Sequence, residues 1–243
     1  MRMLTFASRN FKELRRDPLN LAFGLGFPVV LLLLLSAIQA NIPVSLFEIQ
    51  HLAPGVTVFG LSFMTLFSAT VIAKDRAGSF LQRLYSTPLS PADFIFGYTL
   101  PIIPLSVAQC VICYVIAFFL GLPLTVHVLS AIAFIIPISL LFISLGLLFG
   151  SILNDKQVGG VCGALLTNLS AWLSGVWFDL DLLGGVFREI AYCLPFVHAV
   201  ELERTVLLGH YGDALTHLFW VLGYAAVLLC AAVLLFLRQM KRH

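Results

Sequence analysis

Few side chains in this sequence have the types and spacing that catalysis requires. A phosphate-binding loop needs Gly-x-x-x-x-Gly-Lys-Ser/Thr, and none of the four lysines has that context. His198-x-x-Glu201 falls short of His-Glu-x-x-His, so zinc hydrolysis is not indicated. Ser174 and His217 lie in or near apolar runs, where a serine mostly packs or bonds the backbone. We therefore expect no catalytic residue, no metal and no cofactor in this chain.

The cysteines do not suggest a disulfide framework. Five is an odd number, and most of them lie inside apolar runs. Cys110 and Cys113 form a Cys-x-x-Cys, for which buried packing is favoured over redox or metal chemistry, because a metal site needs further His or Cys ligands.

The composition indicates a membrane protein. The 243 residues are 60% hydrophobic and 11% charged, with a mean hydropathy of +1.01, whereas a soluble domain has roughly 25% charged residues. Apolar runs such as Val29–Leu35 lack the alternation of a membrane barrel, which favours helices. We predict an all-α protein with a single transmembrane domain over 1–243, whose six spans cover about 19–39, 52–73, 94–120, 126–153, 158–178 and 214–237.

Two of these segments carry small-residue patterns. Gly146-x-x-x-Gly150 and Gly159-x-x-x-Gly163 offer faces for close helix contact. Such matches are common in membrane helices, so they do not identify a particular packing partner.

Lysine and arginine set the expected orientation. Twelve of the 14 fall in the two termini and the loops after the second and fourth spans, whereas Arg188 and Arg204 fall on the other side. Because basic loops stay in the cytoplasm, we predict a multi-pass protein of the cytoplasmic (inner) membrane with both termini inside.

Residues 2–17 have the pattern of an amphipathic helix. Apolar residues recur at spacings of three and four from Met3 to Leu14, opposite five basic residues. Such a helix lies flat at the inner-leaflet interface, although a solvated basic tail is the alternative. Asp17-Pro18 should end it, since the residue before a proline disfavours the α conformation.

The loop after the second span predicts a short cytoplasmic helix, at about 75–87. Phe80, Leu81 and Leu84 share one side of it, and Thr87-Pro88 ends it. Ser90-Pro91 then resembles the start of the next helix, with a capping serine. A soluble partner could push on such a helix; a simple interfacial connector is the alternative.

The loop of about 179–210 predicts an outer helical hairpin. Its two apolar pieces are too short and too charged to span, but apolar enough to dip into the outer leaflet. Glu201, Glu203 and Arg204 are costly at membrane depth unless paired or wet. They would line a water-accessible vestibule or simply lie exposed on the surface.

These two loops resemble those of the type-2 ABC export permeases, the membrane subunits of ATP-binding-cassette exporters. Asp75-Arg76 resembles the family's charged cluster, although Ala77 stands where a second acidic residue is usual. The resemblance covers nearly the whole chain. The other matching positions are Phe80, Leu81, Arg83, Leu84, Thr87-Pro88-Leu89-Ser90, Phe96 and Gly97 in the first loop, and Pro195, His198, Ala199 and Arg204 in the second.

The resemblance implies partners that hydrolyse ATP. Two separate ATPase chains, with ATP and Mg, would dock beneath the cytoplasmic helix, and a second permease chain, identical or a sister, would complete the pathway within the membrane lipids. No nucleic-acid partner is expected. The residues that this implies for ATPase coupling are Asp75, Arg76, Ser79, Phe80, Leu81, Arg83, Leu84 and Tyr85, and those for the outer hairpin are Pro195, His198, Glu201 and Arg204.

The pathway should lack a cluster of charges, because the spans contain none of the kind that an ion or proton route needs. This favours an amphipathic or lipid-like cargo, such as a drug, an antimicrobial peptide or a lipid. The alternatives are a glycan-lipid exporter and a membrane anchor or assembly factor without transport. The pathway candidates are Thr57, Ser62, Asn168, Ser170, Trp172 and Ser174.

Overall fold

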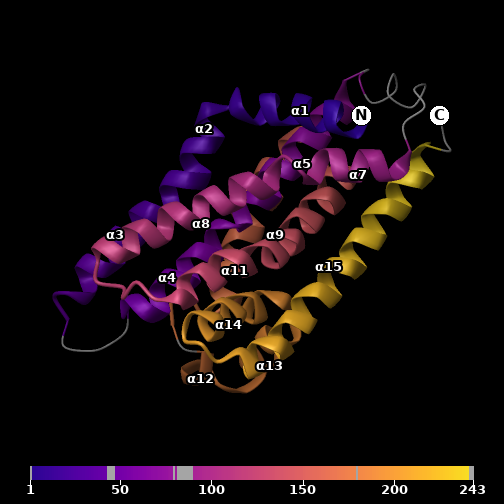
Figure 1. The fold of residues 1–243 in the computed structure, drawn as a ribbon. Coiled ribbons are helices and arrows are strands. Elements are labelled where there is room, and N and C mark those ends of the chain that lie inside the picture. The colour runs from indigo at the N-terminus through magenta and orange to yellow at the C-terminus, as the bar shows by residue number, and fades with distance from the viewer. Residues whose placement is uncertain (1, 43–46, 79, 81–89, 179, 241–243) are drawn as a thin grey trace.

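The computed structural model describes residues 2–42, 47–78, 80, 90–178 and 180–240. Every regular element within these residues is helical (Figure 1), as the sequence predicts. The helices are α1 (Arg2–Arg15), α2 (Pro18–Leu21), η1 (Ala22–Gly26), α3 (Phe27–Gln39), α4 (Ile49–Gly60), α5 (Ser62–Ala77), α7 (Pro91–Thr99), α8 (Ile102–Phe119), α9 (Val126–Ile152), α10 (Asp155–Val158), η2 (Gly159–Leu166), α11 (Thr167–Leu173), α12 (Leu180–Leu183), α13 (Gly185–Cys193), α14 (Pro195–Leu207) and α15 (Tyr211–Met240), where η marks a π-helix.

Five helical segments within the described residues are long and apolar enough to cross a bilayer. Each has at least one 18-residue stretch of high mean hydropathy with two charges or fewer. They are Pro18–Gln39, Ile49–Ala77, Ala92–Phe119, Val126–Ile152 and Tyr211–Arg238. The chain is therefore a membrane protein, but the predicted count of six spans is not confirmed.

The predicted fifth span differs from the other five. The helices α10, η2 and α11 follow one another over 19 residues, from Asp155 to Leu173. Asp155, Lys156 and Asn168 lower its hydropathy. It nevertheless connects the two ends of the α4–α5 helix pair, because Leu153 accepts a hydrogen bond from Arg76 and Gly175 accepts one from Arg204, whose side chain also reaches the carbonyl of His51. At about 1.5 Å per residue it covers about 28 Å, close to the thickness of the hydrocarbon core.

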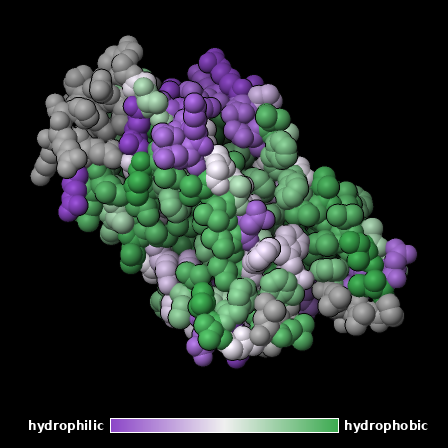
Figure 2. Space-filling model, turned by 180° about the vertical axis from the view of Figure 1, so that it is seen from behind, coloured by the Kyte–Doolittle hydropathy of each residue, from purple (hydrophilic) through white to green (hydrophobic). Residues whose placement is uncertain are grey.

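The two ends of the bundle are built differently. The helix α1 lies across one end, where α15 also finishes, and α12, α13 and α14 gather at the other (Figure 1). The exposed side chains of α1 include Lys12, Glu13, Arg15 and Arg16. Figure 2 shows the resulting hydrophilic patch above a largely hydrophobic surface. That α1 lies in a membrane interface remains a prediction.

The predicted helix start at Ser90-Pro91 is confirmed, and two prolines further along the chain differ in their effect on the helices. Ser90 caps α7 by accepting a hydrogen bond from the backbone N–H of Asp93, whose carboxylate accepts one in return from the N–H of Ser90. Pro101 lies at the break between α7 and α8, because it cannot donate the backbone hydrogen bond of a continuous helix. Pro137 lies inside α9, which continues past it.

The core of the bundle is the contact between α5 and α9, where small residues allow close approach. A Cβ at Gly146 would lie 2.5 Å from the Cβ of Ser68, and one at Gly150 would lie 2.9 Å from the Cα of Ala69. The second glycine pattern packs less closely: a Cβ at Gly163 would make an ordinary contact with the Leu66 side chain of α5, at 3.4 Å, and no atom lies within 4 Å of a Cβ at Gly159. Of the two patterns, the first thus makes the closer contact with α5.

We predict that Gly150→Ala destabilises the protein, whereas Gly159→Ala does not. Both substitutions gain the same helix propensity, but only the first overpacks a helix contact, which costs about 1–3 kcal/mol. Thermal unfolding of the purified variants in one detergent measures the difference. Equal melting temperatures for the two variants would contradict the α5–α9 packing.

Candidate functional site

A buried ion pair joins α1 to the end of α5. The guanidinium of Arg9 donates two hydrogen bonds to the carboxylate of Asp75, at 2.6 and 2.8 Å. The hydroxyl of Tyr98 on α7 donates a third, at 2.9 Å. Asp75 is 4% exposed. Because a bidentate pair fixes orientation as well as distance, these residues hold three helices in one arrangement.

The helix α1 also contacts α7, through a hydrogen bond and through aromatic packing. The side-chain amide of Asn10 donates to the carbonyl of Gly97 at 2.9 Å. The ring of Phe6 meets those of Phe94 and Tyr98 edge-on. A Cβ at Gly97 would clash with the Phe6 ring, so only glycine admits this approach.

The cytoplasmic loop contacts the same junction. Within the predicted helix 75–87, residues 75–77 form the last turn of α5 rather than a separate helix. The guanidinium carbon of Arg9 lies over the ring of Phe80, 4.2 Å from the centroid of that ring. The Phe80 ring also stacks on the ring of Phe6. The remaining coupling candidates lie outside the described residues; they are Ser79, Leu81, Arg83, Leu84 and Tyr85.

Arg76 attaches the end of α5 to the end of α9. Its guanidinium donates to the carbonyls of Gly150 and Leu153, at 2.9 and 3.2 Å. These carbonyls belong to the last turn of α9, where partners within the helix run out. Asp75 and Arg76 are thus both engaged inside the chain.

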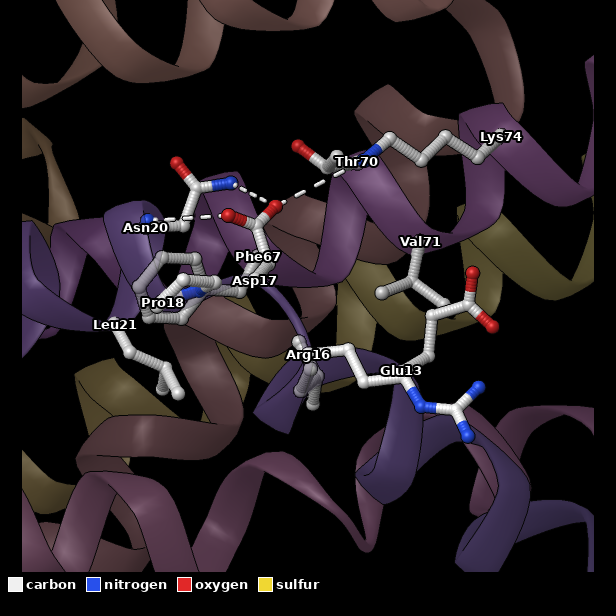
Figure 3. Close-up of a pocket in the computed structure, with 11 residues that line it drawn as sticks. Glu13, Arg16, Asp17, Pro18, Asn20, Leu21, Phe67, Thr70, Val71 and Lys74 are labelled. Carbon is white, nitrogen blue, oxygen red and sulfur yellow. Dashed lines mark hydrogen bonds and ion pairs between the residues drawn. The ribbon is translucent and has the colours of Figure 1, made fainter.

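A cavity of about 270 Å³ lies at the elbow between α1 and α2, against α5 (Figure 3). Its wall is apolar at Leu21 and Phe67 and charged at Arg16 and Lys74. Asp17 spans the elbow: it accepts hydrogen bonds from Asn20 and lies 3.8 Å from the Lys74 ammonium. The elbow is therefore loosely packed. The helix α1 is held mainly by the Arg9–Asp75 ion pair and by its contacts with α7.

The structure divides the pathway candidates into two groups. Four are buried within the chain: Thr57, Ser62, Ser170 and Ser174. Asn168 and Trp172 are exposed, and the Trp172 side chain is 58% exposed. They follow each other by four residues, so they lie on one face of the η2–α11 segment.

In the outer hairpin, Arg204 connects three segments. Its guanidinium pairs with Glu201 at 2.8 Å and donates to the carbonyls of Gly175 and His51, at 3.0 and 3.3 Å. Pro195 is the first residue of α14 and His198 lies in its first turn, facing α15. The hairpin is therefore fixed to the start of α4 and to the segment after α11.

For Glu203 on α14 the prediction was wrong: it was expected to line a water-accessible vestibule or lie exposed on the surface, but its carboxyl group is buried. Glu203 is fully buried, and its Oε1 accepts a hydrogen bond from the Tyr114 hydroxyl of α8 at 2.8 Å. Burial raises the pKa of Glu203 to about 8, although the Tyr114 hydrogen bond lowers it. The one signal in the sequence was a third charge, beside Glu201 and Arg204, in an apolar segment.

Metal and disulfide chemistry find no support in the described part of the chain. No group of three or more His, Cys, Asp or Glu side chains within it is arranged to hold a metal ion. Cys110 and Cys113 are buried thiols that form no disulfide.

Comparison with known proteins identifies the family. The sequence profile described as "ABC-2 type transporter" matches residues 2–208. "Nodulation protein J" of Bradyrhizobium diazoefficiens is 26% identical over 231 residues, which are 93% of this chain and 85% of that protein. "Putative transport permease ycf38" of Porphyra purpurea is 29% identical over 151 residues, which are 58% of this chain and 52% of that protein. The chain belongs to the ABC-2 type transporter family, as its loops indicated.

We predict that Arg9→Met destabilises the protein by on the order of 2 kcal/mol, because the Asp75 carboxylate stays buried without its cation. A double-mutant cycle with Asp75→Asn, followed by thermal unfolding in detergent, measures the coupling between the two side chains. Arg15→Met, on the exposed side of the same helix, is the control. A coupling energy of zero would contradict the ion pair.

The second prediction from this region concerns pH. Because the folded-state pKa of Glu203 is raised, its contribution to stability is present below about pH 4.5 and is lost as the pH rises through about 8. Glu203→Gln keeps the acceptor for Tyr114 and cannot ionise, so the variant should melt above the wild type at pH 9 but not at pH 5. Glu189→Gln, on the exposed surface of α13, should match the wild type at both values.

Proposed function

We propose that this chain is the membrane subunit of an ABC exporter driven by ATP hydrolysis on separate ATPase chains. The observation that carries the proposal is the junction of Arg9, Asp75 and Tyr98, taken together with the family. It lies where the cytoplasmic loop leaves α5, and it connects that loop to two further helices.

The contacts define how a displacement of the loop after α5 would be transmitted to α1, α5 and α7. An ATPase that displaces the loop moves Phe80 against Arg9 and Phe6 of α1. The ion pair carries the motion to α5, and Tyr98 carries it to α7. Asp75 and Arg76 then act as internal connectors rather than as docking groups. Because a bidentate pair resists sliding, the helices move as a rigid body, which is the usual form of such transitions.

The exposed face of the η2–α11 segment is the part of the pathway that we assign. Its exposed side chains Leu165, Asn168, Leu169 and Trp172 are apolar or amide-bearing, without charge. A second permease chain, identical or a sister, faces it across the pathway. Such a surface suits an amphipathic or lipid-like cargo, for which a drug, an antimicrobial peptide and a lipid are the candidates.

The orientation follows the same scheme. The basic residues of α1 and the end of α15 share one end of the bundle, which the positive-inside rule assigns to the cytoplasm. The hairpin of α13 and α14 then lies on the outer side of the cell membrane. There the charged side chains of Glu201 and Arg204, which are partly exposed, border an outer vestibule.

Purification of the chain together with the products of its neighbouring genes tests the proposal. We expect an ATPase to co-purify and, in vesicles, to drive transport of an amphipathic cargo. Phe80→Asp places a second carboxylate beside Arg9, where it competes with Asp75 for the guanidinium, and should lower transport by at least about tenfold, on the order of 1.4 kcal/mol of lost coupling. Hydrolysis and membrane insertion should be retained, and Arg15→Met is again the control.

Three results would contradict the proposal. Normal transport by Phe80→Asp would refute the coupling route, and transport without any ATPase would refute the exporter. An ATPase that is stimulated while no cargo moves, whether amphipathic or glycan-lipid, would indicate an anchor or assembly factor.

A further inference from the structure

Two histidine rings from different helices meet at the outer end of the bundle. Nδ1 of His198 on α14 lies 2.9 Å from Nδ1 of His217 on α15. The indole of Trp220 stacks on the His198 ring, with centroids 4.7 Å apart and planes at 13°. His198 is buried, at 6% exposed, whereas His217 is partly exposed, so the contact is sheltered but remains within reach of solvent through His217.

The neighbours of His198 fix which atom carries the shared proton. Its Nε2 lies 2.9 Å from the backbone carbonyl of Tyr192, which can only accept a hydrogen bond. Nε2 therefore bears a hydrogen, and in the neutral ring Nδ1 has the free lone pair. The hydrogen between the rings consequently comes from Nδ1 of His217.

This arrangement limits how many protons the closed contact can bind. One added proton goes to Nε2 of His217, which leaves the contact in place and makes it a charge-assisted hydrogen bond. A second would have to go to Nδ1 of His198, where it would face the N–H of His217. The closed pair therefore binds one added proton, whereas two separated imidazoles bind two.

The charged groups around the rings come from each of the packed helices. Glu201 on α14 and Asp213 on α15 are the carboxylates that act on the pair. Glu201 is held by Arg204, at 2.8 Å. From α13, the guanidinium of Arg188 lies over the ring of Tyr192, 5.3 Å from its centroid. Burial lowers the pKa of His198, and Glu201 raises it by a smaller amount.

The contact joins two parts of the fold that otherwise have few polar links. Between the hairpin and α15, the described hydrogen bonds are this one and that from the Tyr224 hydroxyl to the carbonyl of Cys193. The rest of the polar attachment of α14 goes to α4, α8 and the segment after α11 through Glu203 and Arg204. Loss of the histidine contact would therefore remove one of the two described hydrogen bonds between the hairpin and α15 and loosen the start of α14, while the apolar packing of α14 on α15 and its other polar attachments remain.

We propose that His198 and His217 form a proton-sensitive latch between the outer hairpin and the last helix, closed at neutral pH and released by uptake of one further proton. Imidazoles that are free in solution titrate near pH 6.5. Below that value the open state binds one more proton than the closed state, so the opening equilibrium rises by up to about tenfold per pH unit. The latch does not depend on the cargo or on the presence of an ATPase.

Hydrogen exchange of the α13–α14 backbone tests the latch directly. The full chain is placed in lipid nanodiscs, and exchange of peptides that cover residues 185–207 is measured between pH 8 and 5 and corrected for the intrinsic rate. We expect protection of the start of α14 to fall by up to about tenfold per unit below pH 6.5. Peptides from α9 should show no such change.

His217→Asn is the informative variant. Its amide nitrogen replaces Nδ1 as the donor, and its amide can turn to accept when His198 is protonated, so the contact should survive at every pH. Protection should then be high and independent of pH. His217→Ala should be unprotected at every pH, and His210→Gln, an exposed histidine at the same end, should behave as the wild type.

The latch is refuted if the wild type and His217→Asn lose protection in parallel as the pH falls, because the pH dependence would then arise elsewhere. It is also refuted if His217→Ala retains the pH dependence of the wild type.

Discussion

The carboxylate of Asp75 lies where water barely reaches, and the arrangement of the helices at this end of the bundle depends on the groups that pair with it. A buried carboxylate is tolerated only when it is paired and hydrogen-bonded. The guanidinium of Arg9 and the hydroxyl of Tyr98 supply this balance from two other helices. The position of α1 is therefore set by an electrostatic requirement of α5, and the packing of Phe6 on Gly97 follows from it.

Two arginines solve a related problem at opposite ends of the α4–α5 pair. The last turn of a helix leaves carbonyl groups without partners within the helix, which is costly away from water. Arg76 donates to such carbonyls at the end of α9, and Arg204 donates to the carbonyl of Gly175 after α11 and also to that of His51 in the first turn of α4. Between these clamps, Gly146 and Gly150 bring α9 within backbone contact of α5. The centre of the bundle is thus rigid, and the adjustable contacts lie at its two ends.

The two ends of the bundle differ in the interactions that a conformational change would alter. At the end that holds α1, an ion pair and an aromatic stack would transmit a displacement of the loop after α5 under the proposed function. At the other end, the hairpin contacts α15 through the histidine pair of the proposed latch. A transporter that alternates between two conformations needs a stiff core and a biased contact at each face, and this chain has groups suited to both.

The sequence by itself determined the class of the protein and the approximate place of its helices. Apolar length is enough for that, because lipid leaves the backbone no alternative to internal hydrogen bonding. The helix 214–237 predicted from the sequence lies inside Tyr211–Arg238, and the loop motif around Asp75 indicated the family. The segment around Asn168 crosses the bundle but is too polar to meet the hydropathy criterion, so its status could not be read from composition alone.

Which side chains meet across the fold was decided only by tertiary structure. Arg9 looks like any other basic residue of α1, and Glu203 looks like its neighbours Glu201 and Arg204. Asp75 lies 66 residues from Arg9, Glu203 lies 89 from Tyr114, and His217 lies 19 from His198. A helical pattern fixes only which residues share a face; the packing of helices distant in sequence fixes which charge is buried and what balances it.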